Sequence, residues 1–133
     1  VGYPGEKEAD FKELFSFIQE YPFDQLGCFA YSDEQGTAAY ELKNKVDEDV
    51  IKLRQEKIME KQFKQVLSQN KRYIGKTVQV IYEGGNQARA RFSAPDIDNT
   101  ILLVKSDNLQ VGNFYQVKIT AQDGYDLVGK VLH

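Results

Sequence analysis

Side chains that carry nucleophilic or metal-binding chemistry are scarce in this chain of 133 residues. Cys28 is the single cysteine, and His133 is the single histidine and the last residue. One thiol cannot form an internal disulfide or a multi-cysteine metal site. With one terminal histidine there is also no Ser-His-Asp or Cys-His arrangement to consider. Because Cys28 lies within an apolar run, we expect it to be a small buried hydrophobic residue.

Charged side chains towards the end of the chain offer a second kind of chemistry, which is electrostatic binding. Arg89 and Arg91 alternate on one predicted strand and could form a small basic patch with Lys76. Four aspartates lie in two predicted loops, at positions Asp96, Asp98, Asp123 and Asp126. These carboxylates either attract a basic partner or act as turn residues that bond to nearby backbone. Residues 74–133 carry six acidic and six basic side chains, a balance that disfavours a surface following nucleic-acid phosphates.

The overall composition excludes several function classes. The formal net charge of −3 gives no general attraction to nucleic acid or to anionic membranes. No apolar stretch approaches the roughly 18 residues of a membrane span, and no signal peptide is visible. The sequence therefore predicts a cytoplasmic protein in a reducing environment.

The first 45 residues predict a strand, a helix and a second strand. A Gly/Pro turn follows Val1, and Phe11, Leu14, Phe15 and Ile18 then form an apolar stripe at helical spacing. The run Leu26–Tyr31 is almost continuously apolar, as in a parallel strand that is covered on both faces. Two such strands cannot close a core, so we expect a slice of an α/β barrel or sheet that begins in the middle of a fold. A polar loop, residues 32–37, leaves the carboxyl edge of the second strand, where α/β folds concentrate function.

The middle of the chain predicts one long helix. Asp47 is a suitable N-cap, Glu48 and Asp49 suit the first turn, and Gly75 is expected to stop the helix. The predicted apolar stripe is loose, and the Lys and Glu residues between its members suit a solvated face; its members are Ile51, Ile58, Met59, Phe63, Val66 and Leu67. We interpret residues 46–73 as a linker helix between two domains.

The last segment predicts five short strands separated by turn residues. Their expected ranges are 77–82, 87–92, 100–105, 114–121 and 127–132. Five short antiparallel strands in this length favour a small closed barrel of the oligonucleotide/oligosaccharide-binding type. The fold class is therefore α+β: part of an α/β barrel in residues 1–45, a linker helix, and a five-stranded β-barrel in residues 74–133.

Three stretches carry a resemblance to a known family. Val1–Phe11, Tyr31–Leu42 and the terminal barrel together resemble the radical S-adenosylmethionine methylthiotransferases, above all in Val1-Gly2-Tyr3-Pro4-Gly5-Glu6 and in the loop that begins Tyr31-Ser32-Asp33. The resemblance covers essentially the whole chain, and it implies that residues 74–133 are a TRAM domain that recruits substrate. Residues 1–45 would then be the C-terminal portion of the radical-enzyme barrel.

Two motifs favour the branch of this family that modifies a ribosomal protein over the branch that modifies tRNA. Ala94-Pro95-Asp96-Ile97-Asp98 resembles a motif of the first branch, with Asp96 in place of the usual Glu, and Tyr125-Asp126-Leu127-Val128-Gly129 is similar to its closing strand. Lys7 and Tyr3 depart from the residues common in the family. The resemblance implies methylthiolation of an aspartate in the twelfth small-subunit ribosomal protein, whose generally basic surface would be attracted to acidic loops.

The same resemblance implies the cofactors of the parent enzyme. Such enzymes use S-adenosylmethionine and two 4Fe-4S clusters that are held by cysteine triplets, which this chain lacks. We therefore expect the chain itself to hold no cofactor and to be inactive. It would supply one wall of the cofactor site, with Gly2, Tyr3, Pro4, Tyr31 and Ser32 as candidate contacts. For Gly2 to Pro4, a simple role in shaping a tight turn is the alternative.

Two other functions stay open at this point. One is a tRNA methylthiotransferase of the same fold, and the other is an autonomous module that binds RNA or protein.

Overall fold

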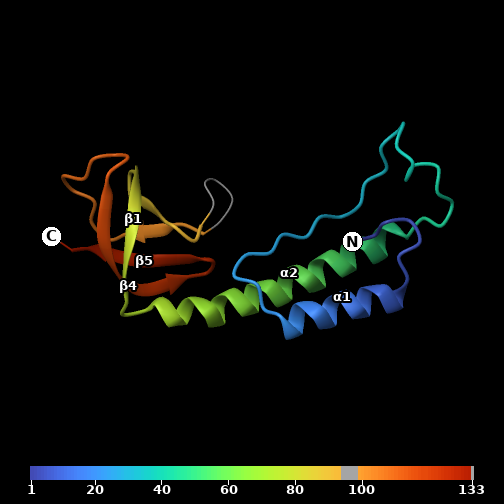
Figure 1. Ribbon diagram of the computed structural model, residues 1–133, viewed down its shortest axis with the longest axis horizontal. Coiled ribbons are helices and arrows are strands. Elements are labelled where there is room, and N and C mark those ends of the chain that lie inside the picture. Colours follow the sequence, from blue (N-terminus) through green and yellow to red (C-terminus); the bar gives the residue numbers. More distant parts are fainter. Residues whose placement is uncertain (94–98, 133) are drawn as a thin grey trace. The chain divides into compact units, whose positions relative to one another are not determined.

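A computed structural model describes residues 1–93 and 99–132, which divide into two compact units, Val1–Gln65 and Val66–His133. Figure 1 traces the elements along the chain. Two helices, α1 (Glu8–Glu20) and α2 (Glu48–Asn70), precede a short 3-10 helix, η1 (Lys71–Tyr73). Five strands follow, and they are β1 (Thr77–Gly84), β2 (Gln87–Ala90), β3 (Ile101–Leu103), β4 (Phe114–Asp123) and β5 (Asp126–Val131). In the described part of the chain, no helix combines the length and the apolar character that crossing a membrane requires.

The first unit is built on the apolar stripe of α1. Phe11 and Ile18 are buried, and they pack with Ile58 of α2 in one small core. The N-terminus of the helix is fixed because the backbone N–H of Lys7 donates to Asp10 at 2.7 Å. Figure 1 shows α1 and α2 side by side, and the amide of Gln65 joins them by donating to the carbonyl of Ile18 at 2.9 Å.

The two strands predicted in the first unit are not formed. Val1 makes the two bonds of a single parallel pairing: its amino group donates to Phe29 O at 2.9 Å, and its carbonyl accepts from Tyr31 N at 2.8 Å. No described residue extends this pairing into a ladder, so Leu26–Tyr31 is extended chain without strand structure. Phe29 is 84% exposed in this chain, so a run covered on both faces stays a prediction for the larger fold.

The long helix begins where the sequence predicts and carries an unexpected buried face. The carboxylate of Asp47 accepts the backbone N–H of Asp49 at 2.9 Å, which confirms the N-cap. Gly75 lies beyond a 3-10 turn, so α2 ends earlier than predicted. Phe63 is exposed, whereas three polar side chains are buried together with the apolar ones. The buried set is Ile51, Arg54, Ile58, Gln62, Val66 and Asn70, with members three or four residues apart on one face.

The second unit is the closed β-barrel that the sequence predicts, with the order β1-β2-β3-β5-β4. All neighbouring strands are antiparallel except β3 and β5, which are parallel and correct the all-antiparallel prediction. β2 and β3 are shorter than predicted, and β4 is longer. Alternate residues fill the interior, among them Val80, Val117 and Ile119. Gly129 is required inside the barrel because a β-carbon there would lie 2.3 Å from Val117 Cγ1.

Candidate functional site

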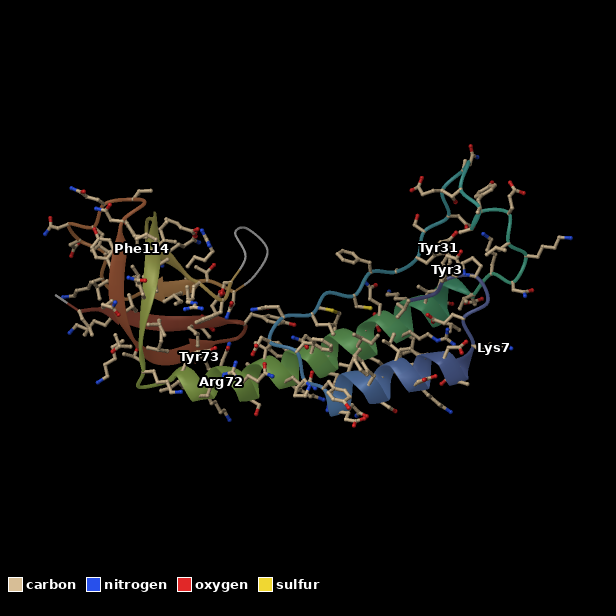
Figure 2. All side chains as sticks on the ribbon, viewed as in Figure 1. Tyr3, Lys7, Tyr31, Arg72, Tyr73 and Phe114 are labelled. Carbon is tan, nitrogen blue, oxygen red and sulfur yellow. The ribbon has the colours of Figure 1, made fainter. Side chains whose placement is uncertain are left out.

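A cavity of about 580 Å³ lies entirely within the first unit. It brings together three of the five residues predicted to contact a cofactor, Gly2, Tyr31 and Ser32. Tyr3 and Pro4 do not line it. Tyr3 is exposed, and its ring meets that of Tyr31 edge-on at a centroid distance of 5.6 Å. Figure 2 labels both residues. The remaining lining residues come from the polar loop and from the start of α2, and they are Ala30, Asp33, Lys45, Val46, Glu48, Ile51, Lys52 and Gln55.

The geometry of Gly2 explains why this position is a glycine. Its φ angle is +85°, which residues with a β-carbon rarely adopt. A β-carbon built there would also lie 2.4 Å from Ile51 Cγ1, well inside van der Waals contact. The close approach that the missing side chain permits is therefore that of α2. This packing accounts for Gly2 without a ligand, and a contact between Gly2 and a cofactor stays a prediction.

A polar cluster closes the loop that borders the cavity. The Lys45 ammonium donates to the Asp33 carboxylate and to the carbonyl of Ala39, and the Tyr31 hydroxyl donates to Asp33 at 2.8 Å. Lys45 also lies over the rings of Tyr31 and Tyr40, at 5.7 and 5.6 Å from their centroids. These contacts tie the two ends of the loop together, so the cavity has a defined rim.

The cluster shifts the pKa of each of its members. The hydrogen bond from Lys45, followed by that from Tyr31, lowers the pKa of the Asp33 carboxyl. The same bond raises the pKa of Lys45. Partial removal from water, followed by the hydrogen bond to Asp33, raises the pKa of Tyr31. At neutral pH the carboxylate and the ammonium are therefore both charged, and the hydroxyl keeps its proton.

Arg54 of α2 fixes the turn that carries Gly2. Its guanidinium is buried and donates to the carboxylate of Glu6 at 2.6 Å and to that of Glu8 at 3.3 Å. The guanidinium carbon also lies 5.4 Å from the centroid of the Phe11 ring. Glu6 ends the glycine-rich turn and Glu8 opens α1, so one side chain holds both against α2.

Four of the six residues predicted to contact a protein substrate lie in the described part of the chain, two on or just beyond β2 and two at the β4–β5 hairpin. Arg89 is half-buried on β2 and is paired with Glu83 at 2.8 Å, whereas Arg91 is exposed just beyond that strand. Asp123 and Asp126 face each other at the β4–β5 hairpin. Asp126 accepts the backbone N–H of Thr100 at 2.8 Å, a bond between residues 26 apart in the sequence that ties the start of β5 to the chain before β3. Asp96 and Asp98 lie outside the described residues.

The outer face of the barrel carries a group of residues that the sequence analysis missed. Lys118 of β4 lies directly opposite Lys130 of β5, and both side chains are exposed. Gln116 is opposite Gln79 of β1, and Phe114, which is 66% exposed, is opposite Ile81. Only strand register brings these residues together, so neither charge totals nor motifs could have found them. We call this group the β4 face; its members are Gln79, Ile81, Phe114, Gln116, Lys118 and Lys130.

Lys45 and Arg54 are also residues that the sequence analysis passed over. Each looks like one of many solvated cations in a charged stretch. A signal was available for Arg54, because it falls on the same helical face as Ile51 and Ile58. No comparable signal marked Lys45, whose partner Asp33 lies across an irregular loop.

Comparison with known proteins places the barrel in a family. Residues 74–132 match the model of the TRAM domain, so the second unit contains a TRAM domain. The chain is 43% identical over 135 residues to the ribosomal protein uS12 methylthiotransferase RimO of Clostridium kluyveri, covering 98% of this chain and 30% of the relative. The RimO proteins of Thermotoga maritima and Pseudothermotoga lettingae are 40% and 37% identical, each over 99% of this chain.

These comparisons confirm the resemblance to the methylthiotransferases that the sequence indicated. The chain spans about a third of the length of the curated relatives it matches, with 32% for the P. lettingae protein.

The chain's own donor set does not fit an iron–sulfur cluster. Such clusters are bound by several thiolates, and this chain has one thiol. Burial raises the pKa of Cys28, which disfavours its thiolate form. Among the described residues, no group of three or more His, Cys, Asp and Glu side chains is placed to hold a metal ion.

Replacing Gly2 by alanine should destabilise the first unit more than replacing Gly5 does. Both glycines have positive φ angles, +85° and +94°, so the backbone strain is matched. A β-carbon at Gly5 meets nothing within 4 Å, whereas one at Gly2 clashes with Ile51. The difference in the free energy of unfolding, measured by urea denaturation, should be about 1–3 kcal/mol. Equal losses in the two variants would contradict the packing role of Gly2.

The Asp33–Lys45 pair predicts how the first unit responds to pH. A lowered Asp33 pKa means that its contribution to stability is present above the unfolded value, about 3.9, and is lost as pH falls through the folded value. A raised Lys45 pKa means that its contribution is lost only as pH rises past about 10.4. In NMR titration of the Asp33 side-chain carbonyl carbon, the midpoint should lie below 3.9, a rough reference value, and Lys45→Gln should raise it. A midpoint that Lys45→Gln leaves unchanged would show that the pair is not formed in solution.

Proposed function

We propose that this chain is the C-terminal part of a radical S-adenosylmethionine methylthiotransferase that modifies an aspartate of ribosomal protein uS12. The observation that carries the proposal is similarity to RimO proteins over 98–100% of the chain, at 37–43% identity. In this proposal the TRAM domain of the second unit recruits the protein substrate. The first unit supplies part of the wall around the cofactor.

The cavity of the first unit supports the role in cofactor binding. Gly2, Tyr31 and Ser32 line it, and their backbone and hydroxyl groups suit the polar parts of a nucleoside such as that of S-adenosylmethionine. The Tyr31 hydroxyl is held by Asp33, and Arg54 holds the turn on which Gly2 lies. The chain's own part is to position these groups, while the radical chemistry would come from S-adenosylmethionine and clusters bound by other cysteines.

Charge on the barrel supports recruitment of a basic protein. Asp123 is exposed at the β4–β5 hairpin, and Asp126 opposite it is half-buried and accepts the backbone N–H of Thr100. Arg89 is neutralised by Glu83, which reduces the positive field around β2. A basic partner approaching the hairpin would meet uncompensated negative charge, which raises the rate of encounter and adds specificity.

Replacing four aspartates by asparagine tests the recruitment proposal. The variant Asp96→Asn, Asp98→Asn, Asp123→Asn and Asp126→Asn keeps turn-forming side chains and removes the charge. Binding of purified uS12, measured by calorimetry, should weaken roughly fivefold and lose much of its salt dependence, because each exposed charge contributes about 0.2–1 kcal/mol. Asp107→Asn, an exposed aspartate in the β3–β4 connection, is the control and should leave the affinity unchanged.

Two outcomes would contradict the recruitment proposal. One is an equal loss of uS12 affinity in the Asp107→Asn control. The other is tighter binding of tRNA than of uS12 at the same ionic strength, abolished by Arg89→Ala with Arg91→Ala. The second result would favour the tRNA-modifying branch of the family.

A further inference from the structure

A groove of about 670 Å³ is lined by residues of α1 and α2 and lies within the first unit. It shares no lining residue with the cavity that holds Tyr31. Phe11 and Phe15 form its apolar floor, with ring centroids 6.0 Å apart. Figure 1 shows the two helices of its walls side by side. The other lining residues are polar or charged, and they are Glu8, Lys12, Ser16, Gln19, Lys57, Glu60, Lys61 and Lys64.

Lysines line both walls of this groove. On the α2 wall, Lys57, Lys61 and Lys64 fall at i, i+4 and i+7, so they form one stripe along the helix. On the α1 wall, the side chain of Lys12 is exposed. A ligand in the groove would therefore meet ammonium groups on both sides.

Most of this positive charge is left uncompensated in the described part of the chain. Lys64 is bonded to Glu60 at 2.6 Å, and the other carboxylate of the groove, that of Glu8, is bonded to the buried Arg54. Within residues 1–93 and 99–132, no carboxylate lies within 4.0 Å of the other three ammonium groups, those of Lys12, Lys57 and Lys61. The groove thus carries three unpaired cations although the chain has a formal net charge of −3.

The floor of the groove suits aliphatic side chains better than flat rings. Phe11 is 5% exposed, and the guanidinium carbon of Arg54 lies 5.4 Å from its ring centroid. Phe15 is half-buried beside it. The Phe11 ring therefore offers no open face on which a nucleobase could stack, whereas a leucine-like side chain can pack against the parts of the rings that stay accessible.

The walls of the groove decide the shape of the ligand. Both walls are helices, whose backbone N–H and C=O groups are bonded within the helix, so an extended peptide would gain no main-chain hydrogen bonds here. Recognition must come from side chains, which suits a ligand that satisfies its own backbone. The lining residues of α1 run from Glu8 to Gln19, about 16 Å of helix, which is the length of about three helical turns.

We infer that this groove binds an acidic amphipathic helix of a partner protein. The apolar stripe of that helix would lie on Phe11 and Phe15. Its carboxylates would lie beside Lys12, Lys57 and Lys61. Charge complementarity selects an acidic partner, and the apolar floor selects a helix with an apolar stripe over a polyanion that has none. This partner is opposite in charge to the basic protein proposed for the barrel, so the inference goes beyond the proposed function and does not rest on it.

Fluorescence anisotropy with the full chain of 133 residues tests the inference. The probe is a fluorescein-labelled helical peptide of about 15 residues, with leucines at i, i+3, i+4 and i+7, glutamates beside them and alanines elsewhere. The wild-type chain should bind this peptide with an affinity that falls as the salt concentration rises. A second peptide, with glutamine in place of each leucine, should bind at least tenfold more weakly because it cannot use the apolar floor.

Removing the three unpaired cations should weaken binding of the leucine peptide. The variant Lys12→Gln, Lys57→Gln and Lys61→Gln should lose roughly tenfold in affinity and much of the salt dependence, because each exposed charge pair changes affinity by a factor of about 1.4 to 5. The matched control makes the same change in net charge outside the groove. Its substitutions replace three exposed lysines, Lys43→Gln, Lys76→Gln and Lys105→Gln, and they should leave the affinity unchanged.

Charge reversal separates loss of binding from loss of folding. The variant Lys12→Glu, Lys57→Glu and Lys61→Glu should reject the glutamate peptide and should bind a peptide that has lysine in place of each glutamate. The wild type should reject this lysine peptide. An unfolded variant could not gain the new specificity.

Any of four results would overturn the inference. The first two are wild-type affinity in the Lys12/Lys57/Lys61 glutamine variant and an equal loss in the control variant. The third is equal binding of the peptide that lacks leucine. The fourth is tighter binding of a single-stranded oligouridine or of anionic lipid vesicles than of the leucine peptide, since the groove would then be a general anion surface.

Discussion

The buried guanidinium of Arg54 is the interaction on which the first unit depends. It reaches Glu6 at the end of the glycine-rich turn, Glu8 at the start of α1, and the ring of Phe11 in the small core. A guanidinium removed from water is costly unless it is paired, and in Arg54 the two terminal nitrogens meet carboxylates while the buried Nε has no hydrogen-bond partner among the described residues. The two carboxylate bonds couple the position of α2 to that of the turn. Gly2 then packs against Ile51, and the cavity forms where the turn, the polar loop and α2 meet.

In the described part of the barrel, the elements are held together by the closed ring of paired strands and not by a buried ion pair like that of Arg54. Five short strands pair in a closed ring, and the interior of the barrel is filled by alternate residues. The packing at Gly129 is tight, since a β-carbon added there would lie 2.3 Å from Val117 Cγ1. Closure also fixes which side chains share an outer row. The same register that forms the core therefore places Lys118 opposite Lys130.

Sequence patterns predicted the regular elements and missed the contacts made by polar side chains. The stripe of α1 and the Asp47 cap are local signals, and turn residues marked the five strands, so these features could be read directly. Leu26–Tyr31 was predicted as a buried strand from its apolar residues, but a strand needs partners that a local pattern does not contain. The contacts of Arg54 and Lys45 and the pairing within the β4 face join residues that are distant in sequence. The lining of the cavity depends on such contacts too, and only three of the five residues predicted to contact a cofactor line it.

A double-mutant cycle between Arg54 and Glu6 tests the central claim most directly. Arg54→Met and Glu6→Gln each remove one charge and keep much of the side-chain volume, and the free energy of unfolding is measured for the wild type, the two single variants and the double variant. Because the pair is largely buried, with side-chain exposures of 7% and 15%, the account predicts a coupling energy of about 1–3 kcal/mol. Single-variant effects that add to within about 0.5 kcal/mol would mean that the two groups do not interact, and the account of the first unit would be wrong.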